Sequence, residues 1–182
     1  MFDLTGKRAL VTGASGGIGR SLAETFAAEG ASLALTGHAK YEELARWLSD
    51  QPWRDRAIAL KADVAEPDQL EIAMSAAVEK FGRVDVCVAN AGKWPPPSLR
   101  LDEIEVARVR DTVNVNMYGA LWTARAPRKR PQKSANGSVA FGGRFCGLAQ
   151  PATAGLPRRC ANHTSRPRDG QRARDSPGPR RS

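Results

Sequence analysis

Short apolar runs alternate with segments of helical periodicity over the first 126 residues of the chain. Apolar runs bounded by turn residues are typical of buried parallel strands, and apolar residues spaced by three or four positions are typical of amphipathic helices. We predict strands at residues 8–12, 32–36, 57–62 and 84–89, and helices at 18–29, 41–48 and 67–81. This alternation predicts an α/β fold, namely a Rossmann-like, doubly wound parallel sheet that binds ligands at the carboxyl ends of its strands.

The composition of the chain changes near Ala126. Residues 1–126 contain 15 Lys and Arg against 17 Asp and Glu, whereas residues 127–182 contain 13 against 2. Seven of the 12 prolines also follow Ala126, where no strand or helix period is present. Such segments bury too little apolar surface to fold. We therefore predict an incomplete Rossmann-like domain at 1–126, a degenerate remnant of a fifth-strand region at 127–156 and a disordered, basic Arg/Pro-rich tail at 157–182.

The segment TGASGGIG occupies residues 12–19, between the first predicted strand and the first predicted helix. Glycines at this place allow the backbone to approach a ligand closely, and the free N–H groups at the start of the following helix attract a phosphate. A tight turn from a strand to a helix also selects glycine. Three spaced glycines therefore need further support before they indicate a dinucleotide site.

Three further motifs follow in order, namely Ala-Asp-Val at 62–64, Ala-Asn-Ala-Gly at 89–92 and Asn-Val-Asn at 114–116, with Gly119 after them. Together with the glycine loop, they resemble the short-chain dehydrogenase/reductase family over residues 1 to about 126. The resemblance implies an NAD(P)-dependent oxidoreductase that transfers hydride between the cofactor and a small alcohol or carbonyl substrate. Residues 101–126 resemble a long helix through which family members form homo-oligomers. Because the family elements that follow are missing here, we expect an uncovered apolar face and marginal stability instead.

The resemblance also implies roles for individual residues. The glycine loop would hold the pyrophosphate, and Asp63 would accept a hydrogen bond from the adenine amino group, unless it is an ordinary carboxylate of a turn. Asn90 would line the ribose side or only stabilise the sheet. Asn116 would help to hold a water in a proton relay, or would be a local packing residue. The residues expected to bind the cofactor are Gly13, Ser15, Gly17, Ile18, Gly19, His38, Asp63, Val64, Asn90, Ala91 and Gly92, and the expected catalytic residue is Asn116.

The cofactor preference depends on the end of the second predicted strand. An acidic residue there binds the ribose 2′-OH of NAD, and a basic residue accommodates the 2′-phosphate of NADP. The chain has Gly37 at the place expected for the acid, followed by His38 and Lys40. Gly16, where many relatives that prefer NADP have a basic side chain, adds no charge. These residues favour NADP slightly and leave NAD as the alternative.

The catalytic residues of the family are missing from the sequence. In the family a tyrosine donates the proton, a lysine lowers its pKa and a serine holds the substrate oxygen. Neither Tyr41 nor Tyr118 is followed by a lysine four positions later, and family spacing puts the serine at Arg144, the tyrosine at Pro157 and the lysine at Ala161. We expect impaired activity or, as the alternative, a catalytically inactive truncated dinucleotide-binding module. We hypothesise that shifts of the reading frame after about residue 127 removed these residues.

Other classes of site and partner are not expected. The cysteines have no metal-ligand spacing, and Cys87 lies within an apolar run, which predicts a buried thiol and no metal site. We expect a cytoplasmic protein without membrane contact, because no long apolar stretch is present and the first strand begins too early for a secretory signal. The basic tail is a remote candidate for nonspecific nucleic-acid binding, but it lacks a recognition motif and has few aromatic residues.

Overall fold

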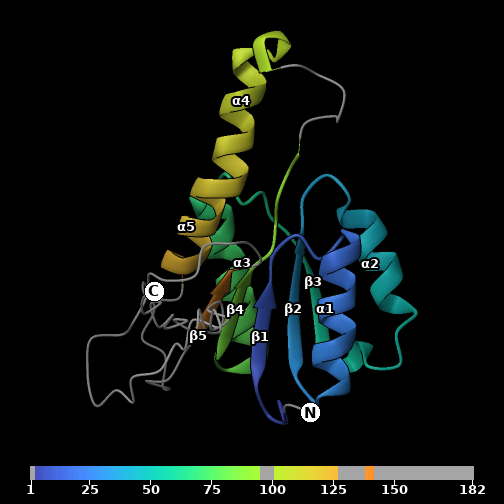
Figure 1. Ribbon diagram of the computed structural model, residues 1–182. Helices are drawn as coiled ribbons and strands as arrows, with labels where there is room; N and C mark the ends of the chain where they lie inside the picture. The colour runs from blue at the N-terminus through green and yellow to red at the C-terminus, as the bar shows by residue number, and fades with distance from the viewer. Residues whose placement is uncertain (1–2, 95–100, 127–137, 142–182) are drawn as a thin grey trace, which may run out of the picture. The chain divides into compact units, whose positions relative to one another are not determined.

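The sheet is parallel throughout and doubly wound, as the sequence predicts. The computed structural model describes residues 3–94, 101–126 and 138–141. Within these ranges the strands are β1 (Arg8–Val11), β2 (Ser32–Gly37), β3 (Ala57–Lys61), β4 (Val86–Ala89) and β5 (Ser138–Phe141). They lie in the order β3-β2-β1-β4-β5, and each neighbouring pair is parallel (Figure 1). The chain therefore reverses its winding direction beside β1, and a crevice forms at such a switch point.

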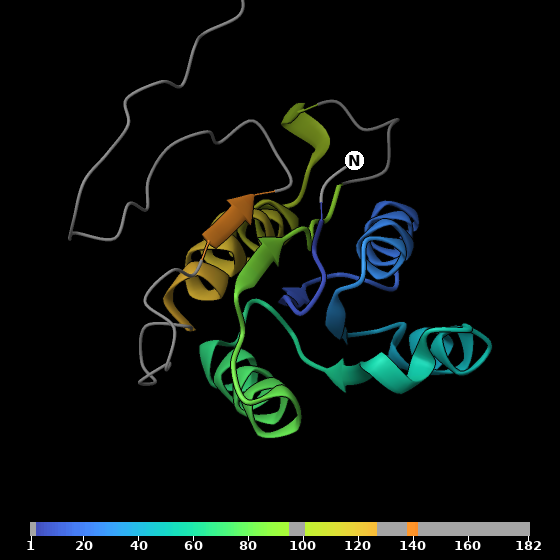
Figure 2. The ribbon, with the colours of Figure 1, turned by 90° about the horizontal axis from the view of Figure 1, so that it is seen from below.

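The helices cover both faces of the sheet. The first three are α1 (Gly17–Ala28), α2 (Tyr41–Ser49) and α3 (Pro67–Phe81), and the short 3₁₀ turn η1 (Arg54–Arg56) precedes β3. Figure 2 shows α1 and α2 on one face and α3 and α5 on the other. The bounds of α3 are those predicted, because Pro67 suits a first helical turn and Gly82, at φ 81°, ends the helix in the left-handed conformation. The other predicted elements differ by one or two residues at their ends.

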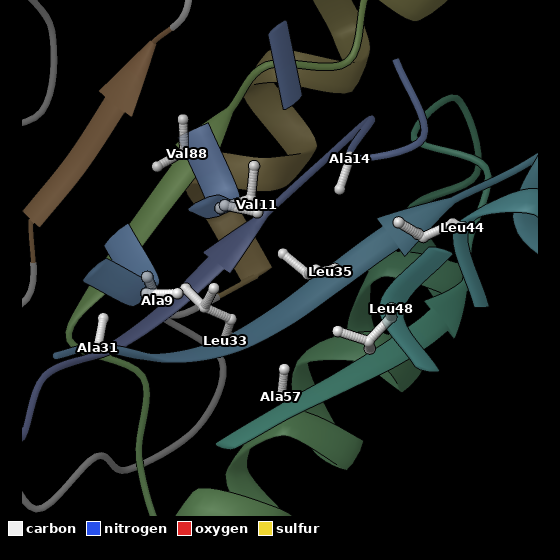
Figure 3. Packing of buried hydrophobic residues seen from close by; sticks show 12 residues of the cluster. Ala9, Val11, Ala14, Ala31, Leu33, Leu35, Leu44, Leu48, Ala57 and Val88 are labelled. Atoms are coloured by element: carbon white, nitrogen blue, oxygen red, sulfur yellow. The ribbon is translucent and has the colours of Figure 1, made fainter. Parts of the chain in front are cut away.

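The core consists of two apolar layers, one on each face of the sheet. Alternate residues of β1 point in opposite directions, as in any strand. Ala9 and Val11 belong to the layer under α1 and α2, with Leu35 of β2 beside them (Figure 3). Leu10 belongs to the other layer and packs with Met74 of α3. Burial on both faces explains why the strands are apolar runs without alternation.

The helix predicted at 101–126 begins later in the structure and contains a π-helical turn. It is divided into the 3₁₀ turn η2 (Leu101–Glu103), α4 (Val106–Val113), the π-helical turn η3 (Asn114–Tyr118) and α5 (Gly119–Arg125). From α4 to α5 the helix continues in one direction (Figure 1). Gly119 allows α5 to approach the turn after β3, since an added Cβ would lie 2.7 Å from Cγ2 of Val64.

One side of this helix is apolar and exposed. Its residues are Val106, Val109, Val113, Met117 and Leu121, each between 38% and 65% exposed. Because they are spaced by three or four positions, they lie along one side of a helix. The expectation of an uncovered apolar face is confirmed for this single chain, whereas marginal stability stays a prediction. Apart from β5, the predicted remnant and tail after residue 126 lie outside the described residues.

Buried Thr12 ties the end of β1 to the end of β4. Its N–H and its hydroxyl both donate to the Val88 carbonyl, at 3.0 and 3.2 Å. Its Oγ1 in turn accepts the N–H groups of Asn90 and Ala91, both at 3.1 Å. The Asn90 side chain completes the network, because Nδ2 donates to the carbonyls of Thr12 at 2.9 Å and Gly13 at 3.3 Å. Six contacts thus fix two strand ends that are distant in sequence.

Replacing Thr12 tests whether its hydroxyl stabilises the junction between β1 and β4. Thr12→Val keeps the shape of the side chain but removes the acceptor of two partly buried N–H groups, so we expect the free energy of unfolding to fall by about 2 kcal/mol. The matched control is Thr25→Val in α1, where the exposed hydroxyl donates to the Ser21 carbonyl of the same helix at 2.8 Å. Urea denaturation followed by circular dichroism measures both variants. Equal losses in the two variants would contradict this role for Thr12.

Candidate functional site

A cleft of about 990 Å³ opens at the carboxyl ends of the central strands. Each of four strand ends contributes to it, through Gly13 after β1, His38 after β2, Asp63 after β3 and Asn90 after β4. Asn116 of η3 lines the same cleft. The cleft therefore lies where the reversal of strand order predicts a ligand.

The structure brings all of the predicted site residues to the walls of this cleft. They are Gly13, Ser15, Gly17, Ile18, Gly19, His38, Asp63, Val64, Asn90, Ala91, Gly92 and Asn116. The prediction does not include Gly16, Ala39, Lys40, Ala62, Lys93, Trp94, Asp111 and Val115, which also line it. Most of these additional residues adjoin a predicted one in the sequence. Asp111 does not, and the π turn that contains Asn116 changes the helical register that could have indicated Asp111.

The glycines of the loop after β1 have different physical roles. At Gly13, with φ 65°, an added Cβ would lie 2.6 Å from Cα of Ala91. At Gly19 it would lie 2.5 Å from the Gly13 carbonyl oxygen. Packing within the protein therefore requires both glycines. At Gly17, which is exposed and lines the cleft, no atom beyond its chain neighbours and its own helix lies within 4 Å of the Cβ position, so the space beside this residue is open.

The first turn of α1 presents unpaired backbone donors to this open space. The helix begins at Gly17, its N-cap Gly16 provides no side-chain hydrogen bond, and its first turn contains no acidic residue. The first N–H groups of an α-helix have no acceptor within the helix, and the positive end of the helix dipole lies at the same place. Both features would suit an anion such as a pyrophosphate, so the residues present fit a dinucleotide cofactor.

Charged side chains lie close together at the end of β2. Nδ1 of His38 is 3.2 Å from Oδ2 of Asp63. The other oxygen of this carboxylate accepts the N–H of Ala65 at 2.9 Å, so Asp63 also shapes its own turn. Nζ of Lys40 is 4.0 Å from a carboxylate oxygen of Glu43. Both oxygens of Asp63 thus have partners within the protein, which agrees with the interpretation of Asp63 as a turn residue and leaves its adenine contact a prediction.

Asn116 holds the backbone that follows β4. Its Nδ2 donates to the Lys93 carbonyl at 2.8 Å, and its Oδ1 accepts the Lys93 N–H at 2.7 Å. The ammonium group of Lys93 pairs with the carboxylate of Asp111 on α4. The side chain of Asn116 therefore has the local hydrogen-bonding role that the sequence left open. Its role in a proton relay stays a prediction.

The contacts of Asn90 agree with a role in stabilising the sheet. Its side-chain nitrogen donates to the backbone carbonyls of Thr12 and Gly13. A contact with the ribose stays a prediction. Thr12, the central residue of this network, is absent from the predicted site, because its partners lie 76 to 79 positions away and no local pattern indicates them.

The thiol of Cys87 is not available for chemistry. Burial raises the pKa of Cys87 to about 12, and its Sγ lies 3.7 Å from the Thr123 carbonyl oxygen. The expectation of a buried thiol is confirmed. Among the described residues, no group of three or more His, Cys, Asp or Glu side chains could hold a metal ion, and no helix there is both long and apolar enough to cross a membrane. The positions that family spacing assigns to the catalytic serine, tyrosine and lysine lie outside these residues.

Known proteins resemble this chain in sequence. A family model described as short chain dehydrogenase matches residues 7–145. L-rhamnose 1-dehydrogenase (NAD(P)(+)) of Sphingomonas sp. (strain SKA58) is 34% identical over 84% of this chain and 63% of its own length. Sorbose reductase of Schizosaccharomyces pombe is 36% identical over 78% of this chain and 56% of its own length. The chain thus spans less than two thirds of the length of these relatives.

Solved structures of short-chain dehydrogenases resemble this chain in fold. A short chain dehydrogenase from Burkholderia cenocepacia in complex with NADP superimposes with a TM-score of 0.68 at 33% identity, covering 77% of this chain and 56% of that protein. A glucose/ribitol dehydrogenase from Brucella melitensis superimposes with a TM-score of 0.70 at 29% identity, covering 77% of this chain and 57% of that protein. The resemblance predicted from the four motifs is confirmed, and the chain belongs to the short-chain dehydrogenase family of oxidoreductases.

Proposed function

We propose that the chain binds NADP or NAD in the cleft at the strand ends and that hydride transfer is impaired. The observation that carries the binding proposal is the open space beside Gly17, at the start of α1, where no side chain caps the helix. Protein packing does not require a glycine there, whereas a pyrophosphate on the helix N-terminus would. The four-motif match to a family of dehydrogenases supports the same function.

The cleft residues divide between the two halves of the cofactor. The N–H groups of Ser15 and Ile18 would hold the pyrophosphate, and Asp63 and Val64 would adjoin the adenine. Residues 90–92 would line the ribose on the nicotinamide side, with Asn116 beyond them. The nicotinamide ring, when bound, would give hydride to a carbonyl carbon or accept it from an alcohol. The protein's part is to hold and orient both molecules, to supply a proton in carbonyl reduction and to accept one in alcohol oxidation.

The supply of that proton is the step that we propose to be impaired. No tyrosine of the described residues lines the cleft. Tyr118 stacks on Trp122, with ring centroids 6.1 Å apart, and is not among the cleft residues. The ionisable side chains of Lys93 and Asp111 also line the cleft, and they pair with each other. The alternative of an inactive dinucleotide-binding module rests on the same observations and on the missing Tyr-x-x-x-Lys motif.

The names of the relatives suggest which ligands to test. One relative is named for both NAD and NADP, and one similar solved structure contains NADP. For this chain we infer a slight preference for NADP, because His38 and Lys40 follow Gly37, where an NAD-selective acid is absent. L-rhamnose and sorbose occur in the names of two relatives, so we infer a small polyhydroxylated alcohol or carbonyl compound as substrate.

Gly17→Val tests the binding site. We expect the branched side chain to fill the pyrophosphate space and to weaken both NADPH and NADH about tenfold or more, as measured by nicotinamide fluorescence. The matched control is Ser21→Val on the next turn of α1, an exposed position outside the cleft that should bind as the wild type does. If wild type and Gly17→Val bind with equal affinity, the proposed site is wrong. NADH affinity equal to or above that for NADPH would refute only the NADP preference.

Turnover is measured with the same protein. The protein is incubated with a panel of alcohols and ketones that includes L-rhamnose and sorbose. The absorbance of the reduced nicotinamide measures the reaction. We expect cofactor binding without appreciable turnover, because no tyrosine-lysine pair is present to transfer the proton. Turnover of roughly 1 per second or faster, which is ordinary for an enzyme, would contradict impairment.

A further inference from the structure

We propose that Lys93 and Asp111 form a subsite for two neighbouring hydroxyl groups of the substrate, and that Trp94 provides its apolar wall. The inference rests on the proposed function, because it assumes that the cleft holds a small hydroxylated compound beside the cofactor. Its own basis is the arrangement of these three side chains at the end of the cleft that contains Asn116. The ligand class that fits this arrangement is a vicinal diol.

The backbone of Lys93 is held in place by Asn116. The Lys93 N–H donates to Oδ1 of Asn116 at 2.7 Å, and the Lys93 carbonyl accepts from Nδ2 of Asn116 at 2.8 Å. Because Asn116 belongs to the π turn η3, these bonds fasten the loop after β4 to the helix. The side chain of Lys93 therefore starts from a fixed position. Groups that are positioned before a ligand arrives lose less conformational freedom when it binds.

The side chains of Lys93 and Asp111 keep hydrogen-bonding capacity for a ligand. Nζ of Lys93 donates to Oδ2 of Asp111, which lies on α4. Both side chains line the cleft and are about half exposed, at 57% and 46%. Within the described part of the chain, Oδ1 of Asp111 has no partner, and an ammonium group has three N–H donors, of which this contact uses one. The pair thus presents a free acceptor beside free donors.

A vicinal diol complements this pair. One hydroxyl group would donate to Oδ1 of Asp111, and the neighbouring hydroxyl group would accept from Nζ of Lys93. Such charge-assisted hydrogen bonds are about twice as strong as those between neutral groups. The pair has no net charge, so it does not favour an anion as an unpaired lysine would. A compound with a single hydroxyl group satisfies only one of the two partners.

Trp94 supplies an apolar surface beside the pair. It follows Lys93 directly in the sequence, lines the same cleft and is 82% exposed. A ring this exposed buries apolar area only when a ligand covers it, and the carbon skeleton of a cyclic diol has such area to share. Small-molecule sites commonly combine an apolar wall with a few placed polar groups. The contribution of Trp94 should not depend on the number of hydroxyl groups.

The subsite adjoins the part of the cleft that we assign to the nicotinamide side of the cofactor. Residues 90–92, which would line the ribose there, lead directly to Lys93. A diol bound to Lys93 and Asp111 would therefore lie beside the reacting end of the cofactor. Holding the diol in this way requires neither the serine nor the tyrosine of the family. The subsite is thus compatible with a chain in which proton transfer is impaired.

Binding of two small ring compounds tests the polar part of the subsite. cis-1,2-Cyclohexanediol and cyclohexanol differ by one hydroxyl group, and saturation-transfer NMR titrations measure their dissociation constants with and without NADP⁺. We expect the wild type to bind the diol about tenfold more tightly than cyclohexanol. Asp111→Asn should remove most of this difference, because the amide is neutral and no longer pairs with Lys93. The matched control is Asp55→Asn, at an exposed position of η1 outside the cleft, which should keep the difference.

Two replacements of Trp94 test the apolar wall. Trp94→Ala should weaken the diol and cyclohexanol by the same factor, about fivefold, because the wall contacts the ring that both compounds share. Trp94→Phe keeps an aromatic wall and should bind both compounds nearly as the wild type does. The diol should change the tryptophan fluorescence of the wild type but not that of Trp94→Phe. The other tryptophans, Trp47, Trp53 and Trp122, are not among the residues that line the cleft.

The outcomes separate this inference from the proposed function. If the wild type binds NADP⁺ but binds the diol no more tightly than cyclohexanol, the subsite is wrong and the dinucleotide site stands. A preference for the diol that is unchanged in Asp111→Asn would also overturn the subsite. If the wild type shows the expected preference for the diol but binds neither NADP⁺ nor NAD⁺, the proposed function is wrong and the contacts with the diol stand.

Discussion

The close approach of the two loops that follow β1 and β4 is the constraint on which the site depends. A side chain at Gly13 would collide with Ala91, and the buried hydroxyl of Thr12 bonds three backbone groups across the same junction. These contacts fix the direction in which the chain leaves β1 and enters α1. They therefore place the free N–H groups of the first turn beside the open space at Gly17.

The two ends of the cleft differ in what they can do. At the start of α1 and at the end of β2, backbone donors and the pair of His38 and Asp63 suit an anionic, hydroxyl-bearing ligand. At the other end, Asn116 and Lys93 bond to each other through side chain and backbone, and no tyrosine of the described residues adjoins them. Binding and chemistry thus have separate structural requirements, and the described residues fit those that we propose for binding.

The sequence was sufficient where local chemistry determines structure. Pro67 and Gly82 give the bounds of α3, and apolar runs indicate strands buried on both faces. The glycine loop and the motifs after it indicate the cleft residues, because the carboxyl ends of parallel strands meet at one edge. The pairing of His38 with Asp63 and the network of Thr12 join segments distant in sequence, and no local pattern indicates such contacts. The π turn η3 likewise lies within residues 101–126, where the family resemblance implied one long helix.

A crystal structure of the chain grown with NADP⁺ tests the central claim most directly, because it locates the dinucleotide rather than only detecting it. The account predicts the pyrophosphate at the N–H groups of Ser15 and Ile18 and the ribose 2′-phosphate beside His38. The adenine should lie near Val64. A dinucleotide bound elsewhere, or a cleft without one in crystals grown at saturating NADP⁺, would contradict it.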